Sequence, residues 1–139
     1  MAYKWDDSLA TGYMTIDNQH IQLFAILDRL IDESKKGMGD EVIFNVIEYL
    51  TTYTMTHFKT EEELMIKYEY KEYPVHYKLH DEFRIKVKEL KKRVIDEGPT
   101  EDIIKLVTDT IGKWLSNHIK YVDYLMADFI KTKDANKNS

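Results

Sequence analysis

Two short stretches decide the fold: His57-Phe58-Lys59-Thr60-Glu61 and His76-Tyr77-Lys78-Leu79-His80. Each has two potential metal-binding side chains four residues apart. In an α-helix such residues lie on one face, about one turn from each other, so a rigid helix can direct both toward a common point. The spacing therefore predicts helices that carry inward-facing ligands.

Apolar residues around these stretches recur at three- and four-residue steps, the period of an amphipathic helix. We expect four long helices, with Asp17, Asp40 and Thr100 as N-caps of three and Pro74 in the first turn of the remaining one. Short connections between long helices favour antiparallel neighbours. The sequence predicts an all-α, up-down-up-down antiparallel four-helix bundle, and residues 1–139 form a single domain.

The two ends of the chain are expected to differ from the bundle. Residues 1–16 lack a long helical period but are rich in aromatic side chains, so we expect an extended N-terminal arm that packs along the helices. The polar tail from about 132 to 139 is predicted to be disordered.

Composition narrows the functional classes. The 139 residues include no cysteine, which excludes disulfides, iron–sulfur clusters and thiolate zinc sites and leaves imidazole and carboxylate as metal ligands. A net charge of −5 without a basic stripe disfavours nucleic-acid binding. No apolar run approaches the roughly 20 residues of a membrane span. We expect a cytoplasmic monomer with no nucleic-acid or membrane partner, and leave open a separate protein partner.

All five histidines fall on the predicted inward faces, with at least one on each helix: His20, His57, His76, His80 and His118. One histidine on an apolar face is most often a core residue that makes a single hydrogen bond. Five buried imidazoles without partners would cost about 1–3 kcal/mol each. A shared metal centre removes that cost for all five together.

Two carboxylates extend the set. In the run of residues 61–63, Glu61 alone stays on the face of His57, because the next two glutamates lie about 100° and 200° further round the helix. Asp123 lies about 140° from His118 on an ideal helix, so it reaches the same centre only through a π-type i→i+5 turn. The alternative is a surface acid.

Five imidazoles and two carboxylates exceed the needs of one metal ion. If both carboxylates and a water-derived group bridge two metals, one metal has three histidines and six ligands. The other then has two histidines, five ligands and one vacant position. A small molecule could therefore bind at one metal only.

The ordered motifs resemble those of the hemerythrins, in the single-domain form of bacteriohemerythrin-like proteins. The resemblance covers residues 5 to about 125. It rests on these residues: Gly12-Tyr13-Met14-Thr15-Ile16-Asp17-Asn18-Gln19-His20 with Leu23-Phe24, His57-Phe58 with Glu61-Glu62 and Met65, His76, His80 and Phe83, and Trp114-Leu115-Ser116-Asn117-His118-Ile119 with Asp123.

This resemblance implies a non-haem centre of two iron ions (Fe2+/Fe3+) with a bridging oxo or hydroxo group. His76, His80 and His118 would hold the coordinatively saturated iron. His20 and His57 would hold the open iron, which has one vacant position, and Glu61 and Asp123 would bridge the two ions. Dioxygen would bind end-on at the open, five-coordinate iron, and nitric oxide, azide or other small anions could also bind. The dioxygen pocket would be lined by Leu23, Phe58, Trp114, Leu115 and Ile119.

We therefore expect reversible dioxygen binding for storage, delivery or scavenging, without enzymatic turnover and with no catalytic residue. Three positions deserve comparison with the family pattern. Met126 stands where relatives commonly have tyrosine, Lys71 stands where proline is common, and Tyr121 is expected near the pocket.

Three alternatives use a similar ligand set. Ferritin-like di-iron oxidases or peroxidases draw Glu-x-x-His motifs from a bundle, and no glutamate here is followed by histidine three residues later. A zinc hydrolase is disfavoured because the pair His76 and His80 lacks the glutamate of His-Glu-x-x-His. An iron-handling protein, or a sensor of nitric oxide or dioxygen, would use the same ligands.

Overall fold

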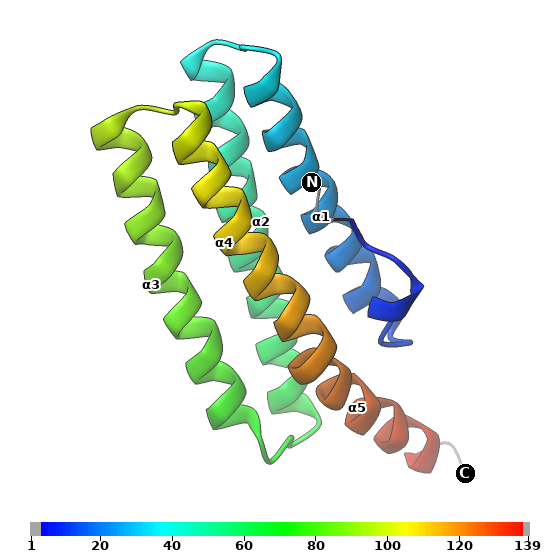
Figure 1. The fold of residues 1–139 in the computed structure, drawn as a ribbon. Helices are drawn as coiled ribbons and strands as arrows, with labels where there is room; N and C mark the ends of the chain where they lie inside the picture. The colour runs from blue at the N-terminus through cyan, green and yellow to red at the C-terminus, as the bar shows by residue number, and fades with distance from the viewer. Residues whose placement is uncertain (1–3, 138–139) are drawn as a thin grey trace.

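The computed structural model describes residues 4–137, and every regular element in that range is helical. The elements in chain order are η1 (Asp7–Leu9), α1 (Met14–Lys35), α2 (Asp40–Lys67), α3 (Tyr73–Glu97), α4 (Glu101–His118), the π-helical turn η2 (Ile119–Asp123) and α5 (Tyr124–Lys137). Because α4, η2 and α5 run on without a break, they form one long rod (Figure 1). Within residues 4–137, no helix has the length and apolar character that a membrane span requires.

The four rods form a closed ring. Helix α1 packs against α2 and α4, and α3 packs against the same two helices from the other side. Successive rods run in opposite directions (Figure 1). The structure is therefore the predicted up-down-up-down four-helix bundle.

The core consists of two apolar clusters. The larger cluster fills the part of the bundle where α1 to α4 all meet. The smaller cluster consists of Ile16, Met65, Met126 and Ile130. On α1, His20 lies between the two clusters, and on α2 Glu61 does. Polar residues thus interrupt an otherwise apolar interior at one level of the bundle.

Two of the four predicted helix starts are confirmed. Pro74 lies in the first turn of α3, and the hydroxyl of Thr100 accepts a hydrogen bond from the N–H of Ile103 at 3.2 Å. At Asp40 the prediction was wrong by one residue. Gly39 is the N-cap of α2 and Asp40 is its first helical residue.

Asp17 is not the N-cap of α1. The helix begins at Met14, four residues earlier than predicted, and Tyr13 precedes it as N-cap. The buried carboxylate of Asp17 instead accepts hydrogen bonds from the N–H and hydroxyl of Thr11, at 2.9 and 2.7 Å, and from the N–H of Gly12 at 3.1 Å. It therefore ties the arm to the helix.

The N-terminal arm is shorter than predicted but packs as expected. Residues 4–13 precede α1 and include the short 3-10 turn η1, while residues 1–3 lie outside the described range. Trp5 and Leu9 pack against the larger apolar cluster. The backbone of the arm runs along the outside of the bundle beside α1 (Figure 1).

The prediction of a disordered tail was wrong for residues 132–137. These residues continue helix α5. The hydroxyl of Tyr68, at the end of α2, donates a hydrogen bond to Asp134 at 2.7 Å, which attaches this helix to the bundle. Residues 138–139 lie outside the described range.

Candidate metal centre

The four rods bring seven polar side chains together inside the bundle. One comes from α1, two each from α2 and α3, and two from the rod that begins with α4. All are at most 4 % exposed. They are the seven predicted ligands: His20, His57, Glu61, His76, His80, His118 and Asp123.

The seven residues form two overlapping groups, each with ligand atoms within 4.8 Å of one another. The three-histidine half is formed by His76, His80 and His118, and the two-histidine half by His20 and His57. Both halves include Glu61 and Asp123. Each group could hold a metal ion, and the two ions would share both carboxylates.

In the two-histidine half, the imidazoles face one particular oxygen of each carboxylate. The distance from His57 Nε2 to Glu61 Oε2 is 2.8 Å. His20 Nε2 lies 3.0 Å from Asp123 Oδ2 and 3.5 Å from Glu61 Oε2.

In the three-histidine half, the imidazoles face the other oxygen of each carboxylate. His80 Nε2 lies 3.0 Å from Glu61 Oε1, and the Nε2 atoms of His76 and His118 lie 3.1 and 3.0 Å from Asp123 Oδ1. Each carboxylate therefore turns one oxygen toward each half, which is the arrangement that two bridged cations require.

The π-helical turn brings Asp123 into the centre. The N–H of Tyr124 donates to the carbonyl of Ile119, five residues earlier. Such a turn contains one extra residue, so Asp123 occupies the position that residue i+4 from His118 would take in a regular helix. The predicted opening of the helix is confirmed, and the alternative of a surface acid is wrong because Asp123 is fully buried.

The seven side chains leave several buried polar atoms unsatisfied. Nε2 of His20, Oε2 of Glu61 and both oxygens of Asp123 have no hydrogen-bond partner among the described residues, despite their short mutual distances. Each such atom would cost about 1–3 kcal/mol. Cations placed among them would satisfy all of these atoms, and a set of imidazole and carboxylate donors suits iron.

Against the effect of burial, the carboxylates of Asp123 and Glu61 raise the pKa of three imidazoles, those of His20, His76 and His118, when no metal is bound. Burial lowers the pKa of His20, but the close carboxylates of Asp123 and Glu61 outweigh burial and raise it to about 9. Burial also opposes the shift at His118, whose pKa the same two carboxylates raise to about 9. A metal must therefore displace protons from the centre.

The carboxylates themselves stay ionised. Burial would raise the pKa of Asp123, and so would the negative charge of Glu61, but His118 and His20 outweigh both and hold it well below its usual range. Burial would also raise the pKa of Glu61, but the surrounding histidines outweigh burial and hold this pKa well below its usual range. Two anionic groups are thus retained in the interior, where a multivalent cation is their strongest partner.

A second layer of polar residues contacts the ligands from outside. Gln19 Oε1 lies 2.6 Å from Nδ1 of His57, and Glu62 Oε2 lies 2.8 Å from Nδ1 of His80. Arg84 donates to the same oxygen of Glu62 at 2.7 Å. Gln19 and Glu62 stand within the motifs that carry the resemblance, but the sequence predicted no contact of Gln19, Glu62 or Arg84 with a ligand. The four-residue spacing of His80 and Arg84 was a signal that both face α2.

Two of the five residues predicted to line a dioxygen pocket stack on imidazoles of the centre. Phe58 stacks on His80 with ring centroids 3.9 Å apart, and Trp114 stacks on His118 at 4.3 Å. Trp114 is half-buried, whereas the other four are at most 1 % exposed. These four are Leu23, Phe58, Leu115 and Ile119. All five belong to the larger apolar cluster or pack against it, and they are called the wall residues below.

The three positions compared with the family pattern lie apart from the ligands. Met126 is fully buried in the smaller apolar cluster, so it acts as a packing residue. Tyr121, expected near the pocket, is 61 % exposed and therefore faces away from the interior. Lys71 is exposed in the connection between α2 and α3.

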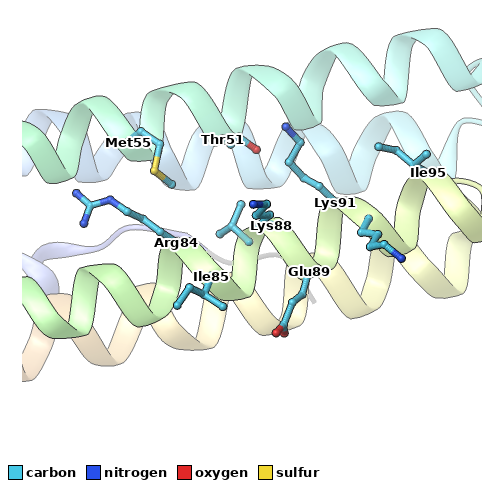
Figure 2. Close-up of a pocket in the computed structure, with 10 residues that line it drawn as sticks. Thr51, Met55, Arg84, Ile85, Lys88, Glu89, Lys91 and Ile95 are labelled. Carbon is cyan, nitrogen blue, oxygen red and sulfur yellow. The ribbon is translucent and has the colours of Figure 1, made fainter.

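A groove of about 630 Å³ lies on the outer surface between α2 and α3 (Figure 2). None of the seven clustered residues or the five wall residues lines it. Three of its cations, Arg84, Lys91 and Lys92, already pair with acidic side chains of the chain. The groove is therefore distinct from the centre. Arg84 lines the groove and also contacts Glu62, which in turn contacts the ligand His80.

Comparison with known proteins agrees with the geometry. The model of the hemerythrin HHE cation-binding domain matches residues 11–130. The chain is 35% identical over 137 residues to a bacteriohemerythrin of Pseudomonas aeruginosa, which covers 93% of this chain and 87% of that protein. It is 31% identical over 123 residues to a myohemerythrin of Riftia pachyptila, with 88% of each chain covered.

The solved structures agree as well. A wild-type hemerythrin superposes with a TM-score of 0.78 and 28% sequence identity, covering 91% of this chain and 96% of that one. The chain belongs to the hemerythrin family. This membership is consistent with oxygen binding at a di-iron site, and the buried cluster of His, Glu and Asp could hold the metal.

Proposed function

We propose that the chain binds dioxygen reversibly at a pair of iron ions held by the seven clustered residues, for storage, delivery or scavenging. The single observation that carries this proposal is the division of both carboxylates between the halves. Oε1 of Glu61 and Oδ1 of Asp123 face three imidazoles, while their second oxygens face only two. With a water-derived bridge, the two-histidine half keeps one free position.

The residues around the centre have distinct tasks in this proposal. Two ferrous ions would supply the two electrons that reversible dioxygen binding requires. The closely packed side chains of Leu23, Phe58 and Leu115 exclude water and the protons that would make binding irreversible. End-on binding at the two-histidine half follows from the placement of the free position.

An absence of turnover is also part of the proposal. An imidazole-rich ligand set favours reversible binding, whereas ferritin-like oxidases use a set rich in carboxylates. Five of the seven clustered residues here are histidines. An oxidase, a peroxidase and a sensor are the alternatives that the experiment must distinguish.

The test is a visible spectrum of the ferrous protein, recorded without oxygen, after exposure to air and after degassing. We expect a ligand-to-iron charge-transfer band that grows in air and disappears on degassing over repeated cycles. Zinc-loaded protein is the control, because zinc has no electron to give. Bleaching with steady oxygen consumption would support an oxidase, and native protein without a transition metal would contradict the proposal.

A further inference from the structure

The two halves of the centre differ in the groups that contact their imidazoles from outside. We propose that Glu62, fixed by Arg84, is a positioning residue that makes His80 a stronger donor to its metal than His57 is, so that the metal in the three-histidine half is bound more tightly and favoured in its higher oxidation state. This inference rests on the proposed function.

The first step is the contact between Glu62 and His80. Nε2 of His80 faces the carboxylates of the centre, which leaves Nδ1 to carry the proton and donate it to Glu62 Oε2 at 2.8 Å. The His80 side chain is fully buried and that of Glu62 is 12% exposed, so little water weakens the bond. A carboxylate in this position fixes the ring and raises the basicity of the nitrogen that binds the metal.

The second step is the fixation of Glu62. Arg84 Nη2 donates to Glu62 Oε2 at 2.7 Å, and its guanidinium lies over the rings of Phe58 and Tyr77 at 5.4 and 5.5 Å. Figure 2 shows Arg84 reaching from α3 at one end of the groove. Because α3 carries His80 and Arg84 one turn apart, both meet Glu62 of α2.

The third step is the contrast with the other half. The outer nitrogen of His57 meets a neutral amide, Oε1 of Gln19 at 2.6 Å, and the same amide donates to the hydroxyl of Thr60 at 3.2 Å. Nδ1 of His20 has no hydrogen-bond partner among the described residues. Of these contacts at Nδ1, the one between Glu62 and His80 involves a carboxylate, and it lies on the three-histidine half.

The unequal number of histidines already makes the two halves differ, so substitutions must separate the contribution of Glu62. Glu62→Gln keeps the size and a possible acceptor but removes the charge. Glu63→Gln, at the next and exposed position of the same helix, is the matched control with the same change in charge. Gln19→Glu is the converse variant, since it places a carboxylate beside His57.

The measurement is an oxygen-free titration with Co2+ against a competing chelator, which yields two dissociation constants. We expect Glu62→Gln to raise the lower of the two dissociation constants by about 10- to 100-fold, the usual loss of metal affinity when a residue that contacts a metal ligand is removed. Glu63→Gln should leave both dissociation constants within about twofold of those of the unmodified protein. Gln19→Glu should lower the higher dissociation constant. In iron-loaded protein, Glu62→Gln should also raise the midpoint potential of one iron.

Two further measurements separate positioning from simple stability. Thermal unfolding of the metal-free variants reports any loss of fold, and Arg84→Lys retains the charge but not the planar guanidinium that donates to Glu62. Should Glu62→Gln fail to fold, Arg84→Gln is the replacement, with a smaller weakening of the same constant expected.

Equal metal constants and potentials in Glu62→Gln and Glu63→Gln would overturn the inference. If such protein still binds dioxygen reversibly, the proposed function stands and only the role of Glu62 is wrong. If unmodified protein binds no transition metal, the proposed function itself fails.

Discussion

The two halves of the centre are built from different helices and show how one bundle makes two unlike sites. The three-histidine half takes its imidazoles from α3 and α4, with His76 and His80 one turn apart on a single helix. The two-histidine half takes one each from α1 and α2, namely His20 and His57. Glu61 joins the halves because it extends from α2 into the middle of the ring. Unequal ligand numbers in the halves therefore follow from how histidines are distributed over the rods.

The largest effect is expected from changing the register of the rod that contributes to both halves. Deleting Lys113, which is exposed in α4, turns every later residue by about 100° relative to the bundle. His118 and Asp123 would both leave the centre, so both metal-binding constants and cooperative unfolding should be lost. Metal titration and circular dichroism measure the two effects.

Deleting Tyr121 is the matched control, because this exposed residue lies within the π-helical turn. Its removal converts the turn into a regular helix, with His118 and the aspartate four residues apart on one face. Metal binding should therefore survive. Loss of binding on a par with the Lys113 deletion would show that the turn does more than absorb one residue.

A smaller effect is expected from removing one imidazole, and it should be confined to one half. His57→Ala should abolish binding in the two-histidine half and with it dioxygen binding, while the other metal remains. His118→Ala should weaken the three-histidine half by about 100-fold or more, since loss of a direct ligand exceeds loss of an outer contact. Counting bound Co2+ per chain checks both, and equal losses from both halves in either variant would contradict the division.

The smallest effect is the pH dependence of the metal-free protein. The pKa of His20 and of His118 is raised to about 9 in the folded state, against about 6.5 in the unfolded chain. Their contribution to stability is therefore complete below pH 6.5 and is lost as the pH rises toward 9. The slope is at most about 1.4 kcal/mol per pH unit for each group.

Urea unfolding at pH 7 and pH 9 measures this loss. Because the pKa of His76 is raised as well, His20→Ala and His118→Ala should each remove only part of the dependence. Zinc-loaded protein should not lose stability over the same range, since the metal has displaced the protons. A metal-free protein equally stable at both pH values would contradict the proposed protonation.

Much of the fold could be predicted from spacing alone. Histidine and glutamate four residues apart, such as His57 and Glu61, must share a helical face whatever the tertiary structure is. Repeated apolar steps and short connections then favour an antiparallel bundle. Even the π-helical turn was predictable, because His118 and Asp123 are five positions apart and point about 140° away from each other on a regular helix.

The errors arose where a side chain acts across a turn or between elements. Asp17 has the composition of an N-cap, but its carboxylate binds the arm that precedes the helix. The polar tail looked disordered because its attachment from Tyr68 to Asp134 joins residues that are distant in the sequence. Local propensity carries no information about such contacts.

By itself, the sequence determined which residues face inward and at what level along each helix, since helical periodicity depends only on spacing. The tertiary structure alone decided how these faces meet. It set which oxygen of Glu61 and Asp123 faces each half, and it placed Glu62 rather than another acid beside His80. The physical reason is that such contacts depend on the relative rotation and closeness of neighbouring helices, which the packing of the whole core fixes.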